Sequence, residues 1–144
     1  MTEHERTQCA TLAALLHAGA LVGLWGFALS AISAAVLALL MPDLSFTATL
    51  SFGCAALLGL LERYFAFRLR FDEKLFDGLA RGHVVSLLSL DVALERLGLR
   101  TAPRAERGLE ERMRATRQLL RRHAVVVVCQ SLMFVLALMT ETLR

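Results

Sequence analysis

An uncharged run of thirty residues, from Leu12 to Met41, constrains this chain more than any other feature. It contains no Asp, Glu, Lys or Arg, and its one ionisable side chain is His17. A helix needs about 20 apolar residues to cross the hydrocarbon core of a bilayer, and apolar stretches of soluble core helices rarely exceed about 14. The run is also about twice as long as the apolar part of a secretory signal. The sequence therefore predicts an integral membrane protein that retains this segment, with Thr7 or Thr11 as the helix cap.

Two further apolar segments follow, at 44–61 and 124–140. Pro42 and Asp43 separate the first two segments, which predicts a tight hairpin at a membrane surface. The third segment is short for a span, so the alternative is a helix buried in a larger assembly. Its only strongly polar side chain is Gln130, which we expect to form a hydrogen bond between helices.

Small residues recur at helical spacing along the first two apolar segments. Such residues let two helix backbones approach closely in lipid, where no hydrophobic effect drives helices together. The alternative is that Gly and Ala are simply common in membrane helices. The residues expected to form this packing face are Gly19, Gly23, Gly26, Ser30, Ser51, Ala55 and Gly59.

The segment 62–123 carries most of the charge, with 14 of the 16 basic and 9 of the 13 acidic residues. Loops rich in Lys and Arg stay on the cytoplasmic side of a membrane. We therefore expect this segment and the N-terminus to be cytoplasmic, with Pro42–Asp43 and Arg144 outside. The near-exclusive use of Arg over Lys is typical of a GC-rich bacterial genome, so the expected location is the bacterial inner membrane.

The second helix is expected to continue past Glu62 as an amphipathic helix, with Glu62 on its charged side. Arg68 and Asp72 interrupt the apolar side at a spacing that allows them to pair. We interpret this side as a surface that docks a partner; the alternative is that it is half buried, with a solvated pair. The residues of this docking face are Tyr64, Phe67, Arg68, Phe71, Asp72 and Leu75.

Two more helical stretches are expected, one over 83–99 and one from Pro103 into the third span. The mean hydropathy of +0.56 is high for a soluble domain and ordinary for a membrane bundle. The fold class predicted is thus all-α: one domain, 1–144, with three transmembrane helices and a cytoplasmic helical extension between the second and third.

The sequence has no motif for nucleotide binding, nucleophilic catalysis or zinc hydrolysis, so we expect no enzyme and no resident cofactor. It also has no nucleic-acid motif. His17 and His123 would lie near the same membrane boundary, where they are the candidates for binding haem or a metal. The alternative is that both are neutral interfacial side chains.

These features favour a non-catalytic accessory or scaffold subunit of a membrane complex. Its expected partners are the lipid bilayer and either another membrane protein or further copies of the chain. Two alternatives remain open: an electron-transfer subunit that uses His17 and His123, and a self-assembling pore or effector.

Overall fold

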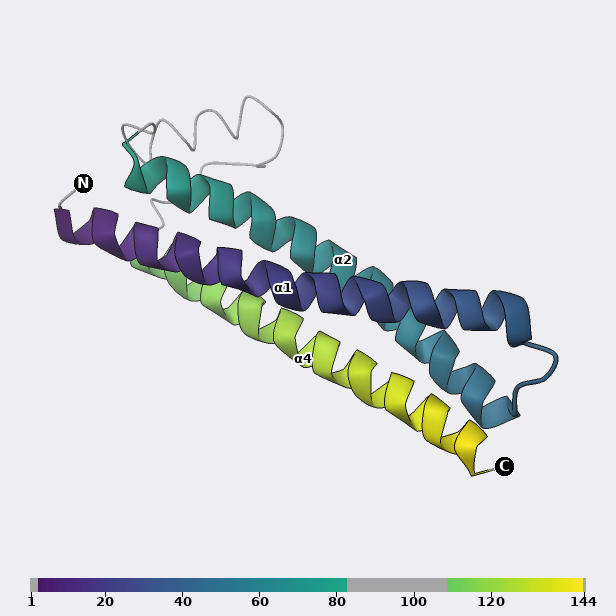
Figure 1. Ribbon diagram of the computed structural model, residues 1–144. Helices are drawn as coiled ribbons and strands as arrows, with labels where there is room; N and C mark the ends of the chain where they lie inside the picture. The colour runs from purple at the N-terminus through teal and green to yellow at the C-terminus, as the bar shows by residue number, and fades with distance from the viewer. Residues whose placement is uncertain (1–2, 83–108, 144) are drawn as a thin grey trace, which may run out of the picture.

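The computed structural model describes residues 3–82 and 109–143, and these residues form three long helices. They are α1 (Glu3–Leu40), α2 (Phe46–Ala80) and α4 (Leu109–Thr142). Helix α2 runs antiparallel to α1 and α4, so the N-terminus and the C-terminus lie at opposite ends of the bundle (Figure 1). The described residues contain no strand. The helix expected over 83–99 and the helix start expected at Pro103 lie outside the described residues.

All three helices are long and apolar enough to cross a membrane, which confirms the predicted set of three apolar helices. They hold 38, 35 and 34 residues. At 1.5 Å per residue each is roughly 50 Å long or more, against about 30 Å of hydrocarbon. Each helix therefore extends well past its apolar segment. Two predictions are confirmed. Helix α2 continues beyond Glu62, and α4 joins the polar residues before Ala124 and the third apolar segment in one unbroken helix.

The start of α1 differs from the prediction. The helix already begins at Glu3, where acidic side chains in the first turn interact favourably with the helix dipole. Thr7 and Thr11 consequently lie inside the helix, and their hydroxyls donate to the carbonyls of Glu3 (3.0 Å) and Thr7 (2.9 Å). Neither threonine caps the helix.

A tight hairpin joins α1 to α2, as the sequence predicts. The amide of Asp43 donates to the carbonyl of Leu40 at 2.9 Å. Ser45 caps α2, because its side chain accepts from the amide of Ala48 at 3.2 Å. Glu141 of α4 accepts the amide of Ser45 at 2.8 Å, which places a carboxylate beside the positive end of the α2 dipole.

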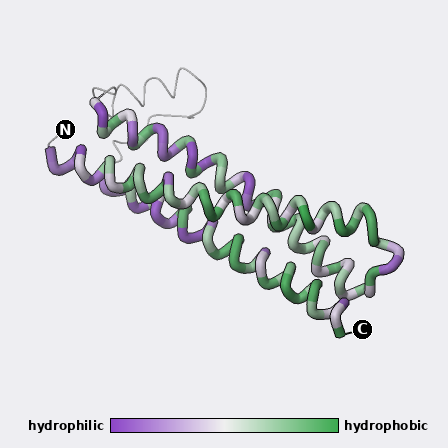
Figure 2. Tube along the Cα trace, viewed as in Figure 1, coloured by the Kyte–Doolittle hydropathy of each residue, from purple (hydrophilic) through white to green (hydrophobic). Residues whose placement is uncertain are grey.

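Hydropathy changes along the bundle: polar residues are concentrated toward the end that holds the N-terminus, and apolar residues dominate the other end (Figure 2). We call these halves the polar end and the apolar end. Each has its own buried hydrophobic cluster. At the polar end the cluster comprises Cys9, Leu12, Ala13, Leu16, Leu69, Phe76, Leu79, Leu109 and Met113. At the apolar end it comprises Ala48, Phe52 and Ala137, with Val36, Leu37, Leu44 and Phe134 packed against them.

Candidate functional site: a buried polar layer

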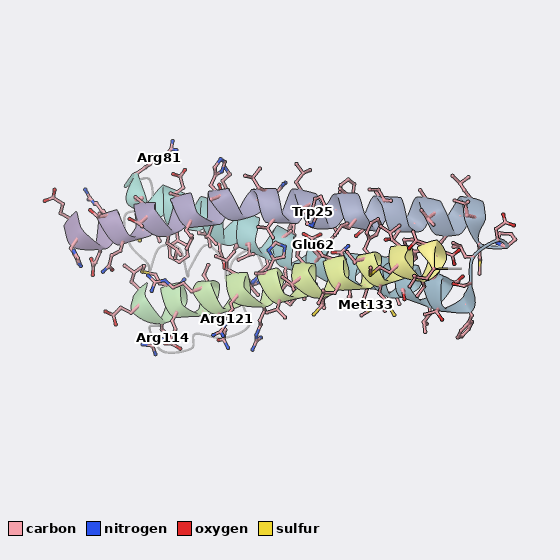
Figure 3. All side chains as sticks on the ribbon, turned by 60° about the horizontal axis from the view of Figure 1, so that its bottom comes forward. Trp25, Glu62, Arg81, Arg114, Arg121 and Met133 are labelled. Carbon is pink, nitrogen blue, oxygen red and sulfur yellow. The ribbon has the colours of Figure 1, made fainter. Side chains whose placement is uncertain are left out.

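A layer of polar side chains separates the two clusters, and Glu62 lies at its centre. Figure 3 shows Glu62 between the helices, with Arg114 and Arg121 toward one end of the bundle and Met133 toward the other. The expectation that Glu62 faces away from the packed side of α2 is wrong, because its side chain is 0% exposed. Glycine makes the room: a Cβ on Gly26 would lie 2.9 Å from Cγ of Glu62.

The Glu62 carboxylate is bound by two basic side chains. His123 of α4 contacts it through Nε2, 3.0 Å from Oε1. Arg63 donates from Nε to Oε2 at 2.7 Å and from Nη2 to Oε1 at 3.0 Å. Burying a carboxylate is costly unless charged partners and hydrogen bonds compensate, and these contacts supply both.

Arg63 also ties α2 to α1. Its Nη2 donates to the backbone carbonyl of Gly23, and its guanidinium carbon lies 5.0 Å from the centroid of the Phe27 ring. A cation over an aromatic face is attracted by the ring quadrupole. One side chain thus joins the buried carboxylate, the α1 backbone and an apolar ring.

Gln130 of α4 forms the second half of the layer. Its Nε2 donates to the carbonyl of Gly26 at 2.9 Å and to Oγ of Ser30 at 2.8 Å, which confirms the predicted interhelical hydrogen bond. Gly59 of α2 packs against Ser30 so closely that a Cβ there would overlap the Ser30 side chain. All three helices therefore meet at this level through small residues and side-chain amide or hydroxyl groups.

The residues expected to form the packing face lie mostly inside the bundle. Gly19 and Ser30 are partly buried. The fully buried members are Gly23, Gly26, Ser51, Ala55 and Gly59. The same spacing continued along α1 would include Ala34 and Ala38, but these are exposed and Ser33 is buried instead. The packing stripe therefore follows the 3.6-residue period of the helix rather than a strict four-residue repeat.

The structure does not bring the two candidate histidines together. His17 has a side chain that is 81% exposed, and its Nδ1 lies 3.1 Å from Oε1 of Glu73. His123 is buried beside Glu62. The two carboxylates are eleven residues apart on α2, which is about 16 Å along the helix axis. The described residues include no group of three or more His, Cys, Asp or Glu side chains arranged to hold a metal ion.

Four of the six residues of the expected docking face lie on the outer side of α2, away from the packed interior. Tyr64, Phe67 and Phe71 are exposed, and the exposed fraction of Phe67 is 74%. Arg68 is also exposed, whereas Asp72 and Leu75 are partly buried.

Asp72 turns toward α4. Its Oδ2 accepts a hydrogen bond from Oγ1 of Thr116 at 3.0 Å. Burial raises the pKa of Asp72, and the Thr116 hydrogen bond and the charge of Arg68 act in the opposite direction. Arg68 therefore stabilises the Asp72 carboxylate through its charge, while the hydrogen bond comes from another helix.

Sequence reasoning missed the Glu62–His123 pair, although a signal for it exists. Glu62 directly follows one apolar segment and His123 directly precedes another. Because α2 and α4 run antiparallel, these two boundaries fall at the same level of the bundle. Two titratable side chains at matching boundaries are candidates for a buried pair.

No protein-family model, curated protein or solved structure matches this chain. Its chemistry must therefore be inferred from the geometry. The buried layer can hold charge and fix the relative register of three helices. Its carboxylate, imidazole and guanidinium groups contact one another directly around Glu62.

Proposed function

We propose that the protein is a non-catalytic accessory or scaffold subunit of a membrane complex, which docks a partner protein through the aromatic face of α2. The observation that carries this proposal is the outward position of Tyr64, Phe67 and Phe71 on a part of α2 that lies beyond its apolar segment. Large exposed aromatic side chains in a row mark surfaces that another molecule covers.

The depth of these residues favours a protein rather than lipid as the cover. The apolar segment 44–61 is about 27 Å long, which nearly fills the hydrocarbon core. Tyr64 then falls at the interface, where aromatic residues are common. Phe67 and Phe71 lie about 9 Å and 15 Å beyond Leu61, whereas the headgroup layer adds only about 6 Å on each side. A helix tilt of about 20° changes these depths little.

Charge supports the proposed orientation in a bacterial inner membrane, with the polar end in the cytoplasm. Exposed arginines surround this end on two helices, including Arg70 on α2 and Arg114, Arg117 and Arg121 on α4. Basic residues next to membrane spans are retained on the cytoplasmic side. The N-terminus would then be cytoplasmic, and the hairpin around Pro42 would face outward.

The test is co-purification in mild detergent from the native host. Phe67→Asp and Phe71→Asp should each abolish recovery of the partner while leaving membrane insertion intact. Phe46→Asp is the matched control, because Phe46 lies on the same helix, is even more exposed and stands at the opposite end. An Asp in the first turn of α2 is also compatible with the helix dipole.

The outcomes separate the possible partners. Loss of a second copy of the chain, detected with two differently tagged copies, would identify the surface as a homo-oligomer interface. Loss of a different membrane protein would identify an accessory subunit. Unchanged complexes in both Phe67→Asp and Phe71→Asp would refute the docking proposal.

A further inference from the structure

We propose that the Glu62–His123 pair is a proton-binding site that exchanges protons with water through a cavity between α1 and α2. His123 is 2% exposed, and its Nε2 is engaged by Glu62. Its other ring nitrogen, Nδ1, is buried and has no hydrogen-bond partner among the described residues. In a neutral imidazole whose Nε2–H donates to a carboxylate, Nδ1 carries the free lone pair to which a proton can add.

A cavity of about 20 Å³ adjoins the ring. A single water molecule needs about 10–15 Å³ and two or more polar neighbours, so the cavity is large enough for one. Its lining includes Gly19, Gly23, Arg63, Arg70 and His123. Two of its lining side chains reach the surface of the bundle, because Arg63 is 42% exposed and Arg70 is exposed.

The charged groups around the His123 ring determine how an added proton changes the local balance of charge. Helix α2 supplies Glu62, Arg63 and Arg70. Helix α4 supplies His123 itself, and its neighbours Arg121 and Arg122 are exposed to the outside.

Helix α1 meets Glu62 through Gly23 and Gly26, which carry no side-chain charge. The only ionisable side chain in its apolar segment, His17, is exposed and pairs with Glu73. With neutral His123 the charges of Glu62 and Arg63 cancel. A proton on Nδ1 creates an imidazolium, so that two cations then share one carboxylate.

This sharing links the proton to helix packing. The imidazolium strengthens its own bond to Glu62 and competes with Arg63, because charge-assisted hydrogen bonds are stronger than neutral ones. Arg63 is the partner able to leave, since it is partly exposed. When it turns outward, α2 loses the hydrogen bond to the Gly23 carbonyl and the contact with Phe27. Protonation is therefore expected to loosen α1 from α2 near this level.

The first experiment follows the ring directly. The full chain, with ¹⁵N-labelled histidine, is titrated in lipid nanodiscs across the range in which imidazoles ordinarily change charge, about pH 8 to pH 5. His123→Gln identifies the signal. We expect both ring nitrogens of His123 to become N–H on acidification, reversibly. A ring that keeps one protonation state across this range refutes the proposal.

The second experiment reads the helix packing. Trp25 is the only tryptophan and lies on α1, where its Nε1 donates to Oγ of Ser131 at 3.2 Å. Its emission should shift with pH in the wild type and stay constant in His123→Gln, which keeps a donor for Glu62 but cannot titrate. His17→Gln, which alters an exposed histidine, should retain the shift.

A variant of the carboxylate separates proton binding from a purely structural role. In Glu62→Gln the imidazolium loses its counter-charge, so the midpoint of the His123 titration should move to lower pH. The Trp25 shift should move with it. Identical titrations in the wild type and Glu62→Gln, or the same Trp25 shift in His123→Gln, would mean that the pair only holds the helices together.

Discussion

The two ends of the bundle differ in which side chains they bury and which they expose. At the polar end large apolar side chains such as Leu12, Phe76 and Met113 are buried, and arginines lie outside. At the apolar end large side chains such as Leu39 and Leu132 point outward, and the interior holds alanines and serines with few large residues. The first pattern is that of a helical bundle in water, and the second is that of a bundle in lipid.

The difference follows from the solvent. In water, burying apolar surface stabilises the packed state, so the polar end has a large hydrophobic cluster. Lipid provides no such driving force, so the helices of the apolar end associate through close approach and interhelical hydrogen bonds. Glu62, His123 and Gln130 occupy the boundary between the two regimes. The exposed aromatic residues of α2, Tyr64, Phe67 and Phe71, are an exception at the polar end, which is why we assign them to docking.

The largest effect is expected from Glu62→Leu. The change leaves buried His123 without an acceptor and Arg63 without its carboxylate, and breaking a buried pair costs about 4 kcal/mol. Unfolding in mixed micelles measures the loss. Glu73→Leu is the control, because the partner of Glu73 is exposed His17. Equal losses in both variants would show that the layer is no more important than a surface pair.

A loss of about 3 kcal/mol is expected for Leu12→Ala, since Leu12 is buried in the cluster at the polar end. Leu132→Ala removes the same atoms from an outward position at the apolar end, where lipid surrounds both the folded and the unfolded helix. It should change stability by less than about 0.5 kcal/mol. The same unfolding assay compares them, and a similar loss for Leu132→Ala would contradict the contrast between the two ends.

Gly59→Ala should cost about 2 kcal/mol, because the added methyl group overlaps Ser30 where the backbones approach. Gly53→Ala is the matched control on the same helix, with no atom within 4 Å of the added group. Alanine favours helix by up to about 1 kcal/mol over glycine, so this control should be neutral or slightly more stable. Destabilisation of both variants to the same extent would argue against close packing at Gly59.

The smallest effect is expected at Asp72, whose pKa burial raises above its ordinary value of 3.8. The folded protein therefore holds this proton more tightly than the unfolded chain, and the wild type gains stability as the pH falls through the raised pKa toward 3.8. Asp72→Asn keeps an acceptor for Thr116 but cannot titrate.

The Asp72→Asn variant should exceed the wild type at neutral pH by less than about 1 kcal/mol, because solvent screens the partly buried carboxylate. This advantage should shrink on acidification. Free energies of unfolding measured at several pH values test the sign, and an advantage that grows toward acid pH would contradict it.

The sequence alone determined the three long apolar helices of the described residues and most positions where they pack. Uncharged length is a local property, so Leu12–Met41 predicts a span whatever surrounds it. Small residues at helical spacing likewise indicate a packing stripe, and Gln130 in an otherwise apolar segment needs a partner within the membrane. None of these inferences requires knowledge of which helices are neighbours.

Only the tertiary structure decided which side of α2 faces inward. A helical wheel separates Glu62 from Phe67 and Phe71, but it does not say which group meets the other helices. The glycines of α1 leave room for the Glu62 side chain, and His123 on α4 provides a partner for its carboxylate. These two features place Glu62 on the inward side. Burial of a charge depends on several helices at once, and no single segment of the chain contains that information.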